Sequence, residues 1–239
     1  MKEGDKMQSQ TNMQQDSSML NWFPKIKDIL PVPKTEILEI SKDEMFEIIG
    51  LLDGDMISEE LHQKIKGATS KIGYPLFMRS DQGSAKHDYE HSCHVVSEDK
   101  LLGNLACLFE RHLMVDLWPV AIVFRELLPL YSDFTAFKGL PIAKERRYFV
   151  NEGAVMCHHP YWPEGAIQHP RHENWVSLLE GMNKESKAEI KHLSEMAIKF
   201  AEAVPGFYSV DFAMTEDHTW YMIDAARGEL SYHPEHKEG

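Results

Sequence analysis

The stretch FYSVDFAMTEDHTWYMIDAAR, residues 207–227, carries the most information about the fold. Two apolar segments, 207–214 and 219–225, flank a short polar run, a pattern typical of two β-strands joined by a turn. Each segment has one aspartate among apolar neighbours, Asp211 in the first and Asp224 in the second. Because a carboxylate in such a strand is costly unless a cation meets it, we expect each aspartate to have a cationic partner.

The geometry of a hairpin places the two aspartates near each other. With the turn centred on Glu216-Asp217, Asp211 pairs opposite Met222, and Asp224 lies two residues farther along on the same face. Diagonal neighbours of this kind lie about 7–8 Å apart at the backbone. Two such carboxylates can share one or two divalent cations, and magnesium suits them because it takes a few carboxylates together with water and substrate phosphates. The hairpin alone leaves an alternative open, in which each aspartate pairs with an arginine such as Arg125, Arg147 or Arg227.

Upstream of the hairpin, helices and strands are interspersed. The clearest helix covers 184–204, where apolar residues recur at helical spacing. The run 120–128 is almost continuously apolar, as in a central strand with both faces covered. Shorter strands are predicted at 35–40, 74–79, 133–138, 141–144 and 147–150, and further helices after Ser41, at 58–71 and from Ser97. Separated helices and antiparallel-looking strands indicate an α+β fold.

Two other segments have the composition of a nucleotide site. The strand ending at Arg79 runs into Gly83-Ser84-Ala85-Lys86, where glycine lets backbone N–H groups approach phosphate oxygens and lysine adds a charge. The spacing of a Walker loop is absent, and a plain surface turn is the alternative. In Arg125-Glu126-Leu127-Leu128, the backbone at a strand end can bond a purine edge, although a solvated strand face explains these residues equally. Asp133 can accept from a ribose hydroxyl or simply belong to a turn.

Several motifs follow one another in a recognisable order. They are Trp22-Phe23-Pro24-Lys25, Ser84-Ala85-Lys86-His87-Asp88, Asp133-Phe134-Thr135-Ala136-Phe137, Val210-Asp211-Phe212 and Ile223-Asp224-Ala225-Ala226. In this order, over roughly residues 22–228, the chain resembles the ATP-grasp superfamily. The likeness is strongest to the clade around the eukaryotic cell-division-cycle proteins that help to assemble a translation initiation complex.

The resemblance implies an ATP-grasp-like α+β fold, with two lobes, antiparallel sheets and a nucleotide cleft between them. It divides the chain into four parts: a disordered tail 1–18, a reduced N-terminal subdomain 19–72, an ATP-grasp nucleotide-binding domain 73–232 and a frayed end 233–239.

The resemblance also implies Mg²⁺ and ATP as ligands. Phosphates would lie against Arg79, Ser84 and Lys86, and the nucleoside against Arg125, Glu126, Leu127, Leu128 and Asp133. Asp211 and Asp224 would hold magnesium, and Arg147 and Arg227 would steady the transferred phosphoryl group. The implied activity is that of a ligase that activates a carboxylate as an acyl phosphate for attack by an amine or thiol. The alternative is an ATP-binding assembly or chaperone-like factor that acts on a protein partner without ligase turnover.

Three positions depart from the family pattern. Ala226 stands where the family has an asparagine metal ligand, Thr135 replaces an arginine, and Arg79 occupies a place where many ATP-grasp enzymes have lysine. The first departure removes one usual ligand of the metal, so weaker metal binding and weaker catalysis are expected.

Composition narrows the class of protein. With 25 basic and 38 acidic residues the net charge is -13, which argues against nucleic acid or an anionic membrane as the main partner. Three cysteines in 239 residues are too few for a disulfide scaffold, so a reducing, cytoplasmic setting is expected. A zinc module built on Cys93, Cys157 and the histidines beside them is a further alternative, although no paired C-x-x-C is present.

Overall fold

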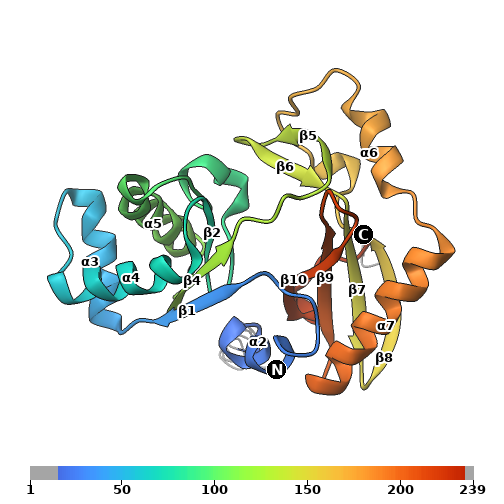
Figure 1. The fold of residues 1–239 in the computed structure, drawn as a ribbon, viewed down its shortest axis with the longest axis horizontal. Coiled ribbons are helices and arrows are strands. Elements are labelled where there is room, and N and C mark those ends of the chain that lie inside the picture. Colours follow the sequence, from blue (N-terminus) through green and yellow to red (C-terminus); the bar gives the residue numbers. More distant parts are fainter. Residues whose placement is uncertain (1–15, 235–239) are drawn as a thin grey trace, which may run out of the picture.

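The N-terminal lobe is a four-stranded antiparallel sheet with helices packed on one face (Figure 1). The computed structural model describes residues 16–234. The sheet order is β1-β4-β2-β3, with bounds β1 (Thr35–Glu39), β2 (Leu76–Ser80), β3 (His94–Val95) and β4 (Ala121–Glu126). The helical segments are α3 (Lys42–Gly50), η1 (Leu51–Asp53), α4 (Glu59–Ile72), η2 (Lys86–His91) and α5 (Glu98–Leu113). The prediction of a central strand is confirmed, because β4 lies between β1 and β2.

Alternation along the strands decides which side chains this lobe turns toward the rest of the molecule. Met78 and Phe124 are fully buried in the apolar cluster that β2 and β4 share with α3, α4 and α5. Successive side chains of a strand point to opposite faces. The neighbouring residues Arg79 and Arg125 therefore lie on the face that is turned away from the helices.

The C-terminal lobe is a second four-stranded antiparallel sheet, in the order β10-β9-β7-β8. Its strands are β7 (Glu145–Asn151), β8 (Ala154–Pro160), β9 (Tyr208–Met214) and β10 (Trp220–Arg227), followed by η4 (Gly228–Leu230). Helix α7 (Lys187–Ala203) packs on one face, where Phe200 meets Tyr148, Val210 and Phe212 in a buried cluster. Arg147 and Asp211, one position away along their strands, consequently face the other side.

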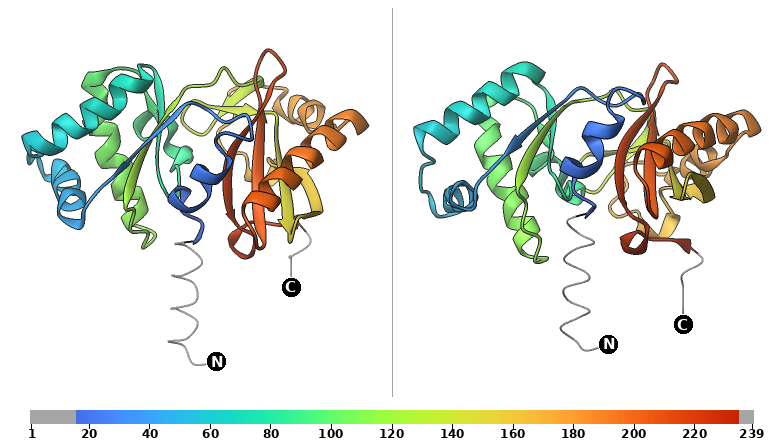
Figure 2. Two further views of the ribbon diagram at one scale, coloured as in Figure 1. Left: turned by 60° about the horizontal axis from the view of Figure 1, so that its bottom comes forward. Right: turned by 90° about the horizontal axis from the view of Figure 1, so that it is seen from below.

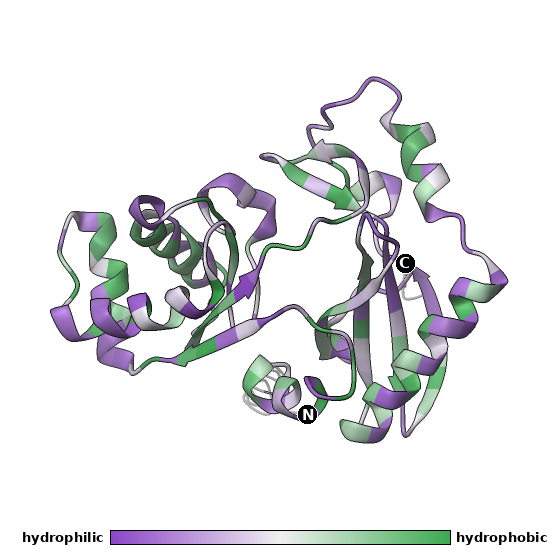
Figure 3. Cartoon of the chain, viewed as in Figure 1, coloured by the Kyte–Doolittle hydropathy of each residue, from purple (hydrophilic) through white to green (hydrophobic). Residues whose placement is uncertain are grey.

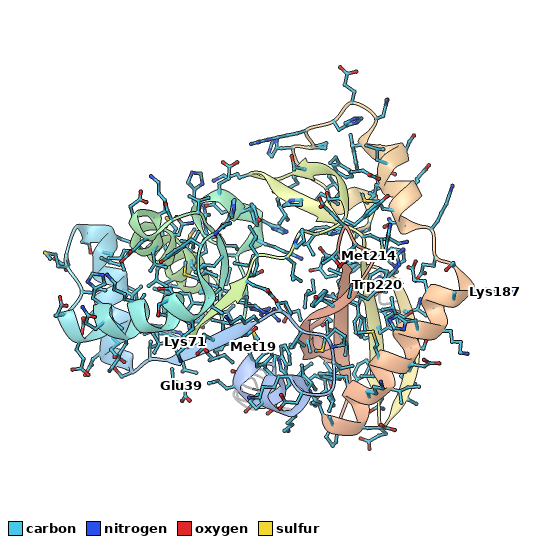
Figure 4. All side chains as sticks on the ribbon, in the orientation of Figure 1. Met19, Glu39, Lys71, Lys187, Met214 and Trp220 are labelled. Carbon is cyan, nitrogen blue, oxygen red and sulfur yellow. The ribbon has the colours of Figure 1, made fainter. Side chains whose placement is uncertain are left out.

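The register of the last hairpin differs from the one predicted. Asp211 pairs with Asp224, not with Met222, which lies opposite Phe212. The turn is centred half a residue later than predicted, since Met214 pairs with Trp220 (both labelled in Figure 4), and this moves each partner by one residue; the register shifts once more between Met222 and Asp224. The two shifts together move the partner of Asp211 by two residues.

A small two-stranded sheet, β5 (Ser132–Ala136) and β6 (Leu140–Ala143), follows the segment that leaves β4. It packs with α6 (Trp175–Asn183) and with Tyr89 and Cys93 of the N-terminal lobe in a third buried cluster. The long connection from β8 to α6, which contains η3 (Glu164–Ala166), is largely hydrophilic (Figure 3).

Helix α2 (Met19–Ile26) lies between the two lobes (Figure 2). Its N-cap Ser18 donates to Asp81 Oδ2 at 2.7 Å, and Asp81 Oδ1 accepts from the backbone of Val120 and Ala121 in the N-terminal lobe. Its apolar face belongs to the core of the C-terminal lobe. The helix therefore ties one lobe to the other.

Some elements were not predicted from the sequence. Strand β8 and helix α6 were missed, and Ser18, which we placed in the N-terminal tail, is a buried helix cap. The remainder of that tail, 1–15, and residues 235–239 lie outside the described residues. Within residues 16–234, no helix combines the length and apolar character needed to cross a membrane.

Candidate functional site

A cavity of about 550 Å³ lies between the facing sides of the two sheets. Strands β2 and β4 contribute Arg79 and Arg125, and the β9–β10 hairpin contributes Asp211 and Asp224. The segment 126–130, which leaves β4 toward the C-terminal lobe, lines one edge. In both sheets, the charged residues of these strands thus face the cavity, while the apolar residues that alternate with them face the helices.

Arg125 supplies an unsatisfied donor to this cavity. The residue is 3% exposed, its Nε donates to Thr35 Oγ1 at 3.2 Å, and its Nη1 donates to the carbonyl of Ile223 at 2.6 Å. Nη2 is buried and has no hydrogen-bond partner among the described residues. Burial, followed by the nearby charge of Arg79, lowers the pKa of Arg125 to about 9. A buried donor of this kind is suited to an anionic ligand, because leaving it unpaired is costly.

Each aspartate of the hairpin is paired with its own arginine. Arg147 donates from Nε to Asp211 Oδ1 at 2.8 Å and from Nη2 to Asp211 Oδ2 at 2.7 Å, a two-bond fork. Arg79 Nη1 lies 2.8 Å from Asp224 Oδ1, which also accepts from the backbone N–H of Ala225. Each aspartate therefore does pair with an arginine. The partner of Asp224 is Arg79, which was not among the arginines suggested from the sequence. The open cavity nevertheless touches both carboxylates.

Lys86 and Glu145 form a second charged pair at the cavity wall. The Lys86 Nζ lies 3.7 Å from Glu145 Oε2 and 4.0 Å from the centre of the Tyr161 ring. Glu145 is 5% exposed, and burial raises the pKa of its carboxyl. Burial acts to lower the pKa of Lys86, but the attraction of Glu145 and its neighbours outweighs this effect and raises it. Lys86 therefore stays protonated and available to an anion.

The segment after β4 forms an apolar edge of the cavity. Glu126 anchors it, because Glu126 Oε1 accepts from the backbone N–H of Lys34 at 2.7 Å and the Glu126 N–H donates to the Lys34 carbonyl at 2.9 Å. Leu127 and Leu128 follow and line the cavity. This edge of the cavity therefore has apolar side chains and a backbone fixed by hydrogen bonds, next to the cations.

The structure brings together most of the residues that the sequence singled out. Nine of the twelve line the cavity: Arg79, Ser84, Lys86, Arg125, Glu126, Leu127, Leu128, Asp211 and Asp224. Arg147 does not line the cavity but forms two hydrogen bonds with Asp211, which does. Arg227 lies elsewhere, 3.0 Å from Glu229 and over the Tyr208 ring. Asp133 is exposed on β5 and does not line the cavity, although Thr135 two residues later does; the register of β5 shifts between Ser132 and Thr135, so regular alternation does not hold there.

Other lining residues were missed. Glu145 had a signal that sequence reasoning did not use: it stands two residues before Arg147, so a strand places both on one face. Ile223 and Glu216 belong to the decisive hairpin but look like an ordinary core residue and a turn residue. Arg171 comes from the connection between β8 and α6, and nothing in its local sequence marks it.

The two aspartates fit a magnesium ion only in part. A carboxylate offers about four lone-pair positions, and the Arg147 fork uses two of those on Asp211. Asp224 Oδ2 has no recorded partner among the described residues, and its side chain is 35% exposed. Two carboxylates beside an open cavity suit magnesium, which takes its other ligands from water and phosphate. Nowhere in residues 16–234 do three His, Cys, Asp or Glu side chains gather as a metal site, which gives the zinc alternative no support.

The sequence matches a known family, and the fold is similar to solved structures. The family model described as ATP-grasp domain, R2K clade family 3, matches residues 68–238. No curated protein matches the sequence. Cdc123 from Schizosaccharomyces pombe has a similar structure, with a TM-score of 0.58 and 14% identity over 95% of this chain and 87% of that one. A C-terminally truncated form of the same protein gives a TM-score of 0.60.

Ligases of the same fold are also similar, over a smaller part of their length. VanG D-Ala:D-Ser ligase from Enterococcus faecalis has a TM-score of 0.53 and 12% identity, covering 89% of this chain and 52% of the ligase. D-alanine–D-alanine ligase from Bacillus anthracis, complexed with ATP, has a TM-score of 0.50 and 14% identity, covering 92% of this chain and 58% of the ligase. The family model spans well over half of the sequence, and the chain therefore belongs to the R2K clade of ATP-grasp domains, family 3.

Proposed function

We propose that this chain binds ATP with magnesium in the cavity between its lobes, and that it uses the bound nucleotide to act on a protein partner. Membership of the ATP-grasp family implies ATP as the ligand. The observation that carries the proposal is the buried Nη2 of Arg125, which has no partner among the described residues and lies at a cavity that Arg79 and Lys86 also line. Three cations around one opening match a polyphosphate.

Each group at the cavity has a role in this proposal. Arg79, Lys86 and Arg125 neutralise phosphate charge, and the backbone of the loop at Ser84 approaches the phosphates. Leu127 and Leu128 contact the base. Asp211 and Asp224 would hold magnesium, which supplies charge neutralisation at the phosphates when bound. Asp133 and Arg227 have no part in the site, because neither lines the cavity.

Two features favour action on a partner over ligase turnover. Arg147, the cation nearest Asp211, is held against that carboxylate by two hydrogen bonds and does not line the cavity, which places it away from a transferring phosphoryl group. Ala226 also lacks the oxygen of the family's asparagine metal ligand. Cdc123, whose clade the sequence resembles, is matched over 87% of its chain, whereas this chain spans just over half of the two ligases.

A carboxylate–amine or carboxylate–thiol ligase is the second candidate. The open cavity beside both aspartates favours it, since ligase chemistry needs a nucleotide and an acceptor at one place. In that reaction a substrate carboxylate attacks the γ-phosphorus and releases ADP, and an amine or thiol then displaces phosphate from the acyl phosphate. Catalysis would rest on positioning and charge neutralisation.

Calorimetry of ATP binding, with and without magnesium, tests the first part of the proposal. We expect one site per chain, with tighter binding when magnesium is present. Phosphate release, measured with mixtures of carboxylates and amines, separates the two candidates: binding without release supports the partner-directed function. Sustained release that depends on an added carboxylate would establish the ligase, and absence of ATP binding would defeat both.

A further inference from the structure

A second cavity, of about 560 Å³, adjoins the nucleotide site. Ser84 and Lys86 line both cavities, so the loop 83–88 is their common wall. The rest of the second cavity comes from the end of α5, the segment that follows it, the turn between β5 and β6, and Tyr161 directly after β8. Nothing in the nucleotide-binding proposal uses this space.

The charges around this second cavity are mainly positive. Arg111 Nη2 lies 2.8 Å from Asp88 Oδ2, and Lys138 Nζ lies 2.7 Å from Asp88 Oδ1. Asp88 stays ionised, because hydrogen bonds from Lys138, His91 and Arg111 outweigh its burial and lower its pKa to about 2. A guanidinium has five donors and an ammonium three, so most donors of both cations remain for another acceptor. One carboxylate thus only partly satisfies Arg111 and Lys138, whereas the third lining cation, Lys86, lies 3.7 Å from Glu145.

The positive charge at the second cavity contrasts with the net negative charge of the whole chain. The net charge is -13, so the protein as a whole repels acidic partners. Arg111 and Lys138 have side-chain exposures of 45% and 50%, which leaves them accessible to a ligand. A local group of cations on an acidic protein favours a ligand that carries negative charge of its own.

Apolar side chains continue the cavity outward. Val115 and Leu117 line it, and Val115 is 65% exposed. Met114 and Trp118, on either side in the sequence, are 71% and 49% exposed. Large apolar side chains exposed together on a surface mark an interaction site. A small inorganic anion would gain no binding energy from these apolar side chains, whereas a peptide with both apolar and acidic side chains could contact them and the cations together.

The back wall of the cavity is firmly held. His112 is 3% exposed and bonds Ser80 Oγ at 2.8 Å and the Leu108 carbonyl at 2.7 Å. The Ser80 hydroxyl also accepts from the N–H of Gly83, and a methyl group placed on Gly83 would lie 3.1 Å from His112 Nε2. The loop is therefore packed against α5, which fixes the position of this wall.

We propose that this second cavity binds an acidic peptide segment of the partner protein, with carboxylate side chains on Arg111 and Lys138 and an apolar side chain on Val115. The inference rests on the proposed function, because it identifies the chemistry of the protein on which the nucleotide-bound chain acts. Lys86 and Ser84 face both cavities, so ATP and the peptide change each other's affinity, and by linkage they do so by the same factor.

The test uses fluorescein-labelled hexapeptides and the full chain. One peptide alternates leucine with glutamate, a second alternates leucine with glutamine, and a third carries phosphoserine in place of glutamate. Anisotropy gives the Kd of each peptide with and without ATP and magnesium, and calorimetry gives the Kd of ATP. The variants are Arg111→Gln with Lys138→Gln, and Val115→Asp. Met56→Asp, at a side chain that is 90% exposed and does not line the cavity, is the matched control.

We expect the glutamate peptide to bind and the glutamine peptide to bind at least about fivefold more weakly. The double glutamine variant should weaken binding of the glutamate peptide about two- to thirtyfold, as the loss of two exposed ion pairs predicts, with ATP affinity unchanged. Val115→Asp should weaken it and Met56→Asp should not. Equal binding of the glutamate and glutamine peptides, or of wild type and variants, overturns the proposal, as does tenfold tighter binding of the phosphoserine peptide. If the peptide binds and ATP does not, the proposed function fails while this site stands.

Discussion

Asp211 on β9 lies directly opposite Asp224 on β10, and both line the nucleotide cavity. Strict alternation would have prevented this. Met222 faces the α7 side with Phe212, and a residue two positions farther along a regular strand would face the same way. The register shift between Met222 and Asp224 adds one residue and turns Asp224 to the cavity side, as a β-bulge does. The bulge thus places both carboxylates on the cavity side of the sheet.

The first prediction concerns Asp224. Asp224→Asn should abolish the magnesium-dependent part of ATP binding and leave the fold intact, because asparagine keeps an acceptor for Arg79 but removes the charge that attracts a cation. Calorimetry with and without magnesium measures the change. Asp133→Asn removes the same charge outside the cavity and serves as the control. Unchanged affinity in Asp224→Asn would argue against a metal at this hairpin.

The second prediction concerns Arg125. Arg125→Met should weaken ATP binding about 10- to 100-fold, because charge-assisted hydrogen bonds contribute about 1.5–3 kcal/mol. Arg125→Lys keeps the charge without the guanidinium fork, so we expect a smaller loss. Calorimetric Kd values for the three proteins, with circular dichroism to check folding, decide the matter. Equal ATP affinity in the methionine variant and wild type would remove the observation on which the proposed function depends.

The third prediction concerns Arg146, which is fully buried on the α7 side of β7. Its Nε donates to Glu189 Oε1 at 2.8 Å, and its Nη2 donates to the carbonyls of Met182 and Lys184. Arg146→Met leaves the Glu189 carboxylate with Lys144, 2.8 Å away, and removes the donor to the two carbonyls, so it should lower the free energy of unfolding by about 1–3 kcal/mol. Urea denaturation measures the loss. Lys191→Met, at an exposed position of α7, is expected to change stability little.

The fourth prediction concerns the tie between the lobes. Ser18→Ala removes the hydrogen bond to buried Asp81 Oδ2 and should lower the free energy of unfolding by about 1–3 kcal/mol. Hydrogen exchange should also become faster across α2, which that bond anchors to the N-terminal lobe. Ser41→Ala removes an N-cap of the same residue type from α3 and should leave exchange in α2 unchanged. Equal exchange of α2 in wild type and Ser18→Ala would show that packing alone holds the helix.

The fifth prediction concerns pH. Burial lowers the pKa of His112 below its ordinary value of 6.5, with Arg79 adding to the effect and bonds to backbone carbonyls opposing it. Below pH 6.5 the unfolded chain then binds more protons at this residue than the folded chain does. Stability from neutral His112 is therefore complete above pH 6.5 and declines as the pH falls below it. Urea unfolding at pH 7.5 and 5.5 measures how much the free energy of unfolding falls with pH. This decrease should be smaller in His112→Gln than in wild type. An equal decrease in both proteins would show that His112 does not contribute to the pH dependence of stability.

Much of the site was predictable because it depends on local patterns. Apolar neighbours marked Asp211 and Asp224, and the run into β4 marked Arg125 as the end of a central strand. Asp133 was misplaced because its neighbourhood reads equally as a turn or a ribose contact. Glu145 was overlooked although its two-residue spacing from Arg147 places both on one face.

The sequence by itself determined the antiparallel strands, the buried faces and the group of charged residues that the cavity collects, because these follow from hydrophobic periodicity within each segment. Only the tertiary structure decided that Asp224 pairs with Arg79, that Asp211 pairs with Arg147, and that a bulge, in a register other than the predicted one, brings both carboxylates to the shared face. Partner choice and the bulge depend on contacts between residues far apart in the chain. A one-residue shift in register reverses the face of every residue that follows it. Local periodicity therefore cannot determine the ion-pair partners or the position of the bulge.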